Sequence, residues 1–388
     1  GDEMSGRNRR SRVLRLVLSV CAAFIALFLW GWTVRAAPAS FPAEVKDQAV
    51  ARLGASVSGV ITQSATWTVG ESPYLLSGDV VITRGVALTV EPGVEVQFDH
   101  HESRLEVYGT LLAEGTVTQP ISFTGGSDTH WRGLYVHPGA SARLTHMVIE
   151  HSGSSGAGRS LYIASDDVEV THTVIRDGYG RDALYIANGA SPTISSTQIL
   201  NNRGKAIYIE DIGSDPWLWD NVVSGNDYDR VSLPGGTLPA NRTWGSDWTS
   251  TPLPYVVRAD VSVPMTYTLT VDPGVEVQFD DSEARLTVFG GLLAEGTATQ
   301  PITFTGGSDA YWRGLYVHAE GLAHIAHAVI ERGGSAAVGR PLYIASDDVE
   351  VTHTTIRDGY GRDALYIFGG ASPVISSTQI LDNRGKAI

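Results

Sequence analysis

Tyrosines recur at fixed intervals along the chain, inside short apolar segments. Leu161-Tyr162-Ile163 is followed at one constant interval by Leu184-Tyr185-Ile186 and then by Ile207-Tyr208-Ile209. Alternation within each segment turns the tyrosine away from its two aliphatic neighbours, which predicts an exposed row of rings. Such rings could stack on sugar rings, or they could stack on each other and stabilise a sheet. The predicted members are Tyr135, Tyr162, Tyr185 and Tyr208, and in a second row Tyr316, Tyr343 and Tyr366.

A charged residue precedes each of these tyrosines by three positions. The resulting column consists of Arg132, Arg159, Asp182 and Lys205, repeated as Arg313, Arg340, Asp363 and Lys386. Arginine forks beside aromatic rings could hold carboxylate or sulfate groups of a glycan, and an arginine or lysine could act as the base of a lyase. The alternative is a ladder of ion pairs between neighbouring coils, because an aspartate stands between two cations.

Other polar groups suggest chemistry less strongly. Asp166-Asp167 and Asp347-Asp348 could be paired catalytic acids or a calcium site, but their setting between apolar strands favours turns in which Asp caps the backbone. His146 and His172, followed by Ser196 and Asp220, fall in one column with copies at His327 and His353. We expect a hydrogen-bonded ladder there rather than a metal site, since two histidines are too few for a closed zinc shell. Cross-coil pairs are predicted for Glu150 with Arg176 and for Glu331 with Arg357, and Trp131 and Trp312 should lie over the edge of the core or join the tyrosines.

These residues are positioned by a repeat. The stretch from Leu88 to Ile207 recurs from Leu269 to Ile388, position for position and without a gap. Within it, short β-branched strands recur roughly every 22 to 27 residues and are joined by turns such as Arg176-Asp177-Gly178. A unit of this size cannot bury its apolar side alone, so successive coils must stack into a solenoid.

The segments Leu88–Phe98, Leu111–Thr116 and Gln119–Thr124 resemble the secreted bacterial right-handed parallel β-helix repeat proteins of the pectate-lyase-like superfamily. The resemblance covers about residues 60 to 388 and implies an all-β, right-handed parallel β-helix. The internal repeat predicts two tandem units of about eight coils, the second unit truncated. That superfamily contains pectate lyases, polygalacturonases, epimerases and many surface proteins of no known activity. The polygalacturonase pattern of separated acids, Gly-His-Gly and Arg-x-Lys is not reproduced in this sequence.

The amino terminus has the features of an export signal. A cationic run from Arg7 to Arg15 precedes an apolar stretch from Leu16 to Trp32 and small residues around Ala36 and Ala39. We therefore predict a signal peptide at 1–39, cleaved rather than retained as an anchor, then a linker or cap with a short helix at 40–66. The two β-helix units are predicted at 67–247 and 248–388, and we expect the natural chain to continue past Ile388. The sole cysteine, Cys21, lies in the leader, so the exported part has no thiol chemistry.

The net charge and the expected localisation restrict the classes of partner that this protein could bind. The formal net charge is −14, and the leader carries +4 of opposite sign, which leaves −18 for the remainder. Such a field disfavours nucleic acid, anionic membranes and polyuronates. We expect an extracellular or cell-surface protein that contacts the membrane only through its leader. It should bind a polysaccharide or cell-wall component without catalysis, or display a rigid stalk; the alternative is a polysaccharide lyase, epimerase or hydrolase. No cofactor is predicted, with calcium as the one ion that could take part.

Overall fold

The computed structural model describes residues 54–126, 130–154, 158–245, 249, 252–307, 311–335 and 339–388. The predicted signal peptide, Cys21 and the expected capping helix near residues 41–50 lie outside these residues. Arg52–Ile388 form one compact unit. Within the described part of the chain, the only helical segment is the single 3₁₀ turn η2 (Val69–Glu71), and no helix is long and apolar enough to cross a bilayer.

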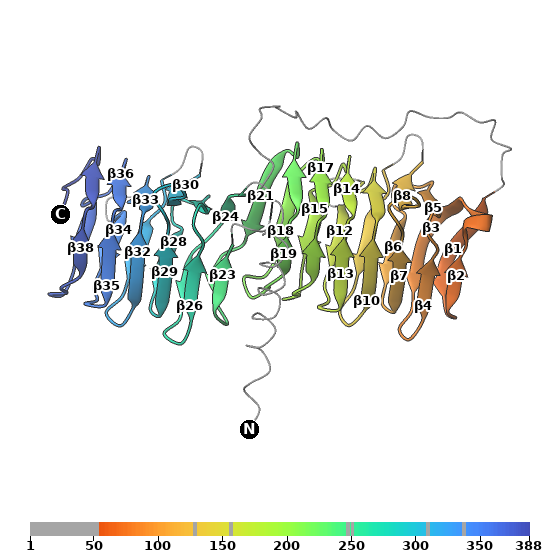
Figure 1. Ribbon diagram of the computed structural model, residues 1–388, viewed down its shortest axis with the longest axis horizontal. Helices are drawn as coiled ribbons and strands as arrows, with labels where there is room; N and C mark the ends of the chain where they lie inside the picture. Colours follow the sequence, from red (N-terminus) through yellow and green to blue (C-terminus); the bar gives the residue numbers. More distant parts are fainter. Residues whose placement is uncertain are drawn as a thin grey trace, which may run out of the picture. The chain divides into compact units, whose positions relative to one another are not determined.

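The fold is a parallel β-solenoid of about 12 turns, which confirms the predicted all-β class. Figure 1 shows the strands of successive coils lined up in chain order from β1 to β39. Every pairing between the described strands is parallel, and partners lie one coil apart in sequence. The chain therefore advances by one strand spacing per coil, about 4.8 Å.

Each coil of the first repeat has three sides. The first side is a seven-stranded sheet of β2 (Ala65–Trp67), β4 (Ala87–Val90), β7 (Thr110–Glu114), β10 (Ser141–Thr145), β13 (Val168–Thr171), β16 (Thr193–Ser195) and β19 (Trp217–Trp219). The second side contains β5 (Glu95–Phe98), β8 (Ile121–Gly125), β11 (Met147–Glu150), β14 (Val174–Arg176), β17 (Gln198–Leu200) and β20 (Val222–Ser224). The third side contains β6 (Arg104–Val107), β9 (Gly133–Val136), β12 (Arg159–Ile163), β15 (Asp182–Ile186), β18 (Lys205–Ile209) and β21 (Tyr228–Leu233).

The long strand β3 (Tyr74–Ile82) joins the second and third sides into one 20-stranded sheet. Its first part pairs with β5 and its last part with β6, while β1 (Ala55–Ile61) pairs along its other edge. Residues 55–61 therefore form a strand of the first coil, inside the segment expected to be a linker or cap.

The second repeat has the same three strand types. One six-stranded sheet contains β23 (Arg242–Trp244), β26 (Thr268–Val271), β29 (Gly291–Glu295), β32 (Leu322–Ala326), β35 (Val349–Thr352) and β38 (Val374–Ser376). Another contains β22 (Gly236–Thr237), β25 (Val261–Val263), β28 (Arg285–Val288), β31 (Gly314–Val317), β34 (Leu342–Ile344) and β37 (Leu365–Ile367). The third group, β24 (Tyr255–Val257), β27 (Glu276–Phe279), β30 (Ile302–Gly306), β33 (Ala328–Glu331), β36 (Thr355–Arg357) and β39 (Gln379–Leu381), continues the 20-stranded sheet.

The two copies of the sequence repeat lie on different strand ladders. β4 and β26 begin at equivalent positions of the two copies, Ala87 and Thr268, but the ladder of β4 ends at β19 and that of β26 begins at β23. Some coils are longer than the sequence period suggested, because loops are inserted between the strands. The coil from Thr110 to Ser141, for example, is longer than the coil from Ala87 to Thr110.

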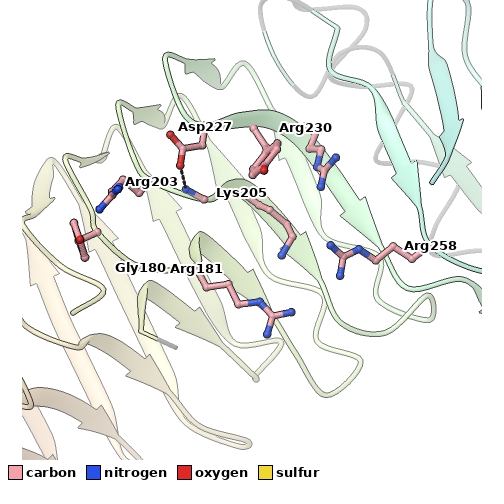
Figure 2. A pocket seen from close by; sticks show the side chains of 10 residues that line it. Gly180, Arg181, Arg203, Lys205, Asp227, Arg230 and Arg258 are labelled. Carbon is pink, nitrogen blue, oxygen red and sulfur yellow. Dashed lines mark hydrogen bonds between the residues drawn. The ribbon is translucent and has the colours of Figure 1, made fainter. Parts of the chain in front are cut away.

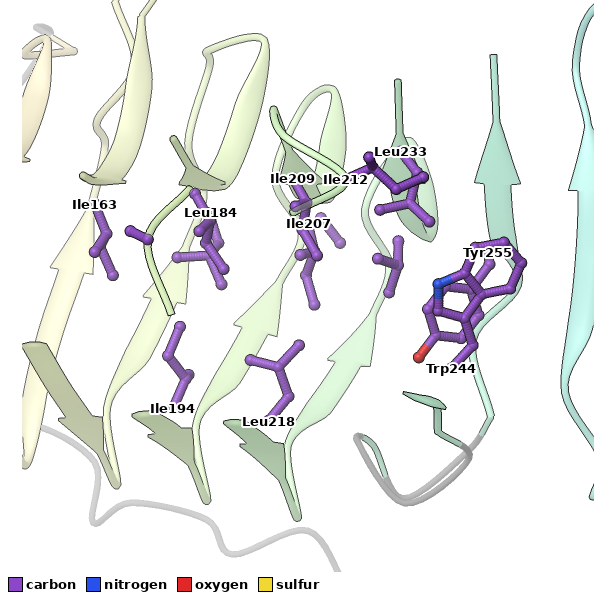
Figure 3. Packing of buried hydrophobic residues seen from close by; sticks show 14 of the residues in the cluster. Ile163, Leu184, Ile194, Ile207, Ile209, Ile212, Leu218, Leu233, Trp244 and Tyr255 are labelled. Atoms are coloured by element: carbon purple, nitrogen blue, oxygen red, sulfur yellow. The ribbon is translucent and has the colours of Figure 1, made fainter. Parts of the chain in front are cut away.

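The core is one cluster that runs inside the stacked coils. Aliphatic residues one coil apart lie directly over each other, as Leu161, Leu184 and Ile207 do. Figure 3 shows Ile194 and Leu218 from the first side facing this column across the interior. Aromatic pairs fill the wider parts: Trp131 stacks on Phe98 with ring centroids 3.8 Å apart, and Trp312 repeats this on Phe279 at 4.3 Å. Each such side chain contributes about 1.5–3 kcal/mol by burial.

Candidate ligand-binding pocket beside the tyrosine row

The first tyrosine row lies on the third side, in the predicted register. Tyr135, Tyr162, Tyr185 and Tyr208 sit on consecutive strands and pair directly with each other. Their ring centroids are separated by 5.3, 5.5 and 5.0 Å, with stacked geometry. The rings of Tyr162, Tyr185 and Tyr208 form a cluster with Ala164 and Ala187, separate from the main core. The row therefore satisfies the alternative in which tyrosines stabilise the sheet.

The row is less exposed than predicted: Tyr135 and Tyr185 are buried, and Tyr162 and Tyr208 are half-buried. Tyr135 is 8% exposed and Tyr185 only 6%. The cause is the cationic side chains that lie over the rings: the Arg159 guanidinium carbon is 3.8 Å from the Tyr185 centroid, and the Lys205 amine is 4.7 Å from that of Tyr208. Contacts of this kind contribute about 0.5–2 kcal/mol each. The faces that would stack on a sugar are covered by the protein's own side chains.

Tyr185 also has its polar end satisfied. Its hydroxyl donates a hydrogen bond to Glu210 Oε1 at 2.8 Å. Burial raises the pKa of Tyr185 well above its usual value, and the hydrogen bond to Glu210 raises that pKa further. The neutral phenol is therefore the stable form in the fold.

The charged column is largely an ion-pair ladder. Asp182 is 1% exposed and Lys205 is 6% exposed, and Lys205 Nζ donates to Asp182 Oδ1 at 3.0 Å. Arg159 Nε lies 3.9 Å from the other Asp182 oxygen. Arg132 pairs instead with Glu102, at 2.9 Å. These contacts support the ion-pair alternative for most of the column.

The second repeat reproduces the arrangement. Arg340 Nε lies 3.3 Å from Asp363 Oδ2, and Arg313 pairs with Glu283 at 3.3 Å. The backbones of Asp363 and Lys386 form a β-bridge, and Lys386 is exposed. Tyr316, Tyr343 and Tyr366 stack at centroid distances of 5.2 and 5.8 Å. The Arg340 guanidinium lies 4.0 Å from the Tyr366 centroid.

The two tyrosine rows lie on different ladders. The strand that carries Tyr208 pairs with β21, which continues into β24 and β27. The second row lies on β31, β34 and β37, in the separate sheet that starts at β22. No single straight ligand along one strand ladder can contact both rows.

A surface pocket of about 380 Å³ opens where the first row ends. Lys205 is the one predicted site residue that lines it, as Figure 2 shows. The other lining residues are Tyr179, Gly180, Arg181, Arg203, Gly204, Asp227, Tyr228, Arg230 and Arg258. They come from the turn before β15, from β18 and the turn before it, from β21 and the residue before it, and from the segment after β24. Parallel stacking of coils brings these segments together.

The pocket is strongly cationic in a protein that is acidic as a whole. Its lining contains four arginines and one lysine against the single carboxylate of Asp227, whose Oδ2 accepts a hydrogen bond from the Gly204 amide at 3.1 Å. Arg230 lies 3.8 Å from Asp280, outside the lining. Among the described residues, Arg181 and Arg258 have no carboxylate within 4 Å.

Burial and neighbouring cations lower the pKa values of Lys205 and Arg230. Burial lowers the pKa of Lys205, and the nearby charges of Arg258 and Arg181 lower it further, although Asp182 opposes this. Burial likewise lowers the pKa of Arg230, and Arg258 adds to that shift. The Arg230 Nε is buried without a hydrogen-bond partner among the described residues. The pocket is therefore a region of positive potential with unused donors.

Aromatic rings flank these cations. Tyr179 is 47% exposed and Tyr228 is 51% exposed. Arg203 lies over the Tyr179 ring at 4.3 Å and Arg230 over the Tyr228 ring at 4.6 Å. Unlike the buried row, these rings retain an accessible surface on which a ligand could stack.

Most of the residues that line this pocket were not predicted from the sequence. Arg181 and Arg203 could have been found, because both recur in the second repeat, as Arg362 and Arg384. Arg258 and Arg230 have no such copies, because Ser77 and Ala49 stand at the equivalent positions one repeat earlier. These two arginines occur only where one repeat passes into the next.

The remaining predicted groups have structural partners. Asp166 Oδ1 accepts from the Ser191 amide at 2.8 Å and Asp167 pairs with Arg143 at 2.8 Å, which confirms the turn interpretation. The His146 and His172 rings lie 4.8 Å apart, and the described residues contain no group of three or more potential metal ligands. The predicted pairs Glu150–Arg176 and Glu331–Arg357 are confirmed, both at 2.7 Å. Trp131 is fully buried and does not join the tyrosines.

Fold and site together define a parallel β-solenoid with a cationic surface pocket. No family model matches the chain, and no solved structure matches it. Over 59 residues the sequence is 42% identical to Protein bark beetle of Drosophila melanogaster. This match covers 15% of the chain and 2% of the length of the fly protein. The similarity is local and does not assign the chain to a family.

Proposed function

We propose that this protein is a non-catalytic, extracellular β-solenoid that binds a polysaccharide or cell-wall component at the pocket around Lys205. The observation that carries the proposal is the combination of two half-exposed tyrosine rings, Tyr179 and Tyr228, with arginines packed on them. Sugar rings present apolar faces to aromatic side chains. Guanidinium groups beside those rings donate hydrogen bonds to hydroxyl or acidic substituents.

The tyrosine rows support this pocket instead of binding ligand themselves. Their rings are stacked on each other and covered by Arg159 and Lys205. They rigidify the third side of the coil, and the pocket lies at the end of the first row. A rigid sheet reduces the entropy lost when a site is ordered by ligand.

The lining residues argue against hydrolysis at this pocket. Glycosidases use a pair of carboxyl groups as acid and as base or nucleophile. Asp227 is the single acid of the lining, and it is hydrogen-bonded to a backbone amide. The proposed activity is therefore binding.

Binding is tested by affinity electrophoresis against a panel of neutral and acidic polysaccharides. We expect retention by at least one of them, reduced about tenfold or more in the double variant Tyr179→Ala, Tyr228→Ala, since each stacked ring contributes about 0.5–1.5 kcal/mol or more. The matched control is Tyr360→Ala, the copy of Tyr179 in the second repeat, which also carries an arginine over its ring. Absence of retention by every polysaccharide, or equal loss in the control, contradicts the proposal.

The export part of the proposal rests on the leader sequence. If the segment 1–39 is a cleaved signal, mass spectrometry of protein secreted by an expressing cell will show a mature amino terminus near Ala36 or Ala39. Retention of the whole leader in the membrane fraction would instead indicate a signal anchor.

One observation favours a second candidate, a polysaccharide lyase. Lys205 lines the pocket and has a lowered pKa, as a lysine acting as a base requires. Its amine is however held by Asp182 and is almost fully buried. Unsaturated products formed from a uronate polymer by the wild type, and not by Lys205→Met, would establish the lyase in place of the binding protein.

A further inference from the structure

We infer that the pocket selects an acidic glycan, by holding one oxyanion substituent, a sulfate ester or a carboxylate, between Arg181 and Arg258, beside the paired Lys205. This inference rests on the proposed function and names its ligand class. Figure 2 shows the cationic groups of these three side chains directed toward a common space, while Arg203 lies at the other end of the pocket. Each of the three comes from a different coil.

The first argument concerns the arginine charges in the pocket and their carboxylate partners. Most arginines near the tyrosine row have a carboxylate partner, as Arg159 and Arg132 do. Arg181 and Arg258 have none within 4 Å among the described residues, yet the fold holds them close enough to Lys205 to act on its charge. Like charges held together cost free energy, and an anion bound between them removes that cost.

The second argument is donor geometry. Guanidinium groups offer paired N–H donors that match the oxygens of sulfate and carboxylate groups, and such charge-assisted bonds are about twice as strong as neutral ones. The pocket also contains the buried Arg230 Nε, which lacks an acceptor among the described residues. A volume of about 380 Å³ admits a sugar ring together with its acidic substituent.

The third argument is the position of the cationic cluster relative to the sequence repeat. In the first repeat the place of Arg258 is taken by Ser77, so the cationic cluster is not a copy of something needed in every coil. The overall charge of −14 works against binding an anion elsewhere on the surface. Concentrating cations at one point of an acidic protein confines acidic ligands to that point.

The test compares dextran with dextran sulfate, which share one backbone, by affinity electrophoresis at low and moderate salt. Polygalacturonate provides the carboxylate arm. We expect at least one acidic polymer to bind about tenfold or more tightly than dextran, with affinity falling as salt rises. Arg258→Ser, which installs the residue of the first repeat, should remove about tenfold of that preference.

The matched control is Arg362→Ser, since Arg362 is the second-repeat copy of Arg181 and does not line this pocket. Its binding should be unchanged, and the circular dichroism spectrum of Arg258→Ser should equal that of the wild type. Equal losses in both variants would indicate diffuse attraction and overturn the inference. If dextran or another neutral polymer binds as well as the acidic ones, the anion selection is wrong while the proposed function stands. If no polysaccharide binds, the proposed function fails, and the inference with it.

Discussion

The pair formed by Asp182 and Lys205 shows how individual residues sustain the third side. Both are almost fully buried, and their contact at 3.0 Å links two neighbouring coils. A buried pair of this kind gives little net stability against an apolar replacement, but removal of one partner leaves an uncompensated charge. The pair also holds Lys205 at the edge of the pocket.

Asp182→Asn should therefore lower the free energy of unfolding by about 3 kcal/mol, as measured by urea denaturation. The reason is that the buried Lys205 amine loses its counterion. Asp167→Asn is the control, because that carboxylate is 61% exposed in its ion pair with Arg143, and its removal should cost at most about 0.5 kcal/mol. Equal effects of the two variants would contradict this account.

Buried phenols predict a loss of stability in alkali. Burial raises the pKa of Tyr162, Tyr185 and Tyr343 above the usual value of 10.0. In the unfolded chain these groups ionise first, so above pH 10 the unfolded state binds fewer protons than the folded state and stability falls as pH rises. The contribution is fully present below pH 10.

Urea midpoints measured on either side of pH 10 test this. Tyr185→Phe should show a smaller alkaline loss than the wild type, since one buried titrating group is gone. Tyr179→Phe is the control, because it removes the hydroxyl of a half-exposed ring. A wild-type midpoint that does not fall above pH 10 would show that the rings ionise freely in the fold.

At the scale of the elements, turns set the shape of each coil. The turn between first and second sides places one residue in the left-handed region in coil after coil: His146, His172 and Ser196 have φ of 49, 49 and 48°. His327 and His353 repeat this at 46 and 49°. Polar residues such as His and Asn tolerate this region better than β-branched ones. The histidine column predicted from the sequence is thus a column of turn residues.

Gly133, the first residue of β9, and its copy Gly314 have no room for a side chain. The φ of Gly133 is +121°, and a Cβ there would overlap the carbonyl oxygen of Arg159 in the next coil. Gly133→Ala should lower the free energy of unfolding by about 3 kcal/mol or more in urea denaturation. Gly78→Ala is the control, since a Cβ at Gly78 meets no atom within 4 Å, and it should change stability by less than about 0.5 kcal/mol. A Gly133→Ala protein as stable as the control would show that the coils can separate locally without cost.

At the scale of the whole unit, the two repeats are offset by one side. β21 belongs to the third side of the first repeat, yet it pairs with β24, whose counterpart in the first repeat, Tyr74–Leu76, lies on the second side. The third side of the second repeat starts anew at β22. This offset turns the second tyrosine row away from the first and places Arg258 beside Lys205.

The junction should be the least protected part of the stack. Pairing of β18 with β21 has a register shift. Among the described residues, the second side continues past β20 through the bridge from Asn221 to Thr249. Fewer ladder bonds mean easier local opening. In hydrogen exchange with mass spectrometry, amides of residues 228–245 should exchange faster than those of 159–186 or 285–307. Uniform protection across these peptides would contradict the weak-junction account.

The sequence by itself determined the solenoid, the pairing register and the tyrosine rows. Residues one coil apart, such as Leu161 and Leu184, must stack because each coil buries its apolar side only against its neighbours. The cross-coil pair of Glu150 with Arg176 follows from the same spacing. Such features depend on the repeat period of the coils, which can be read from the sequence.

Only the tertiary structure decided which of these residues remain available to a ligand. Tyr185 and Asp182 match the predicted columns, but long side chains from adjacent coils cover them, and spacing carries no information on that. Arg258 and Arg230 lie outside the repeat and approach Lys205 because the strand ladder shifts by one side at β21 and β24. The pocket forms where segments that are not related by the repeat lie close together. The repeat period in the sequence gives no information on which of these segments become neighbours.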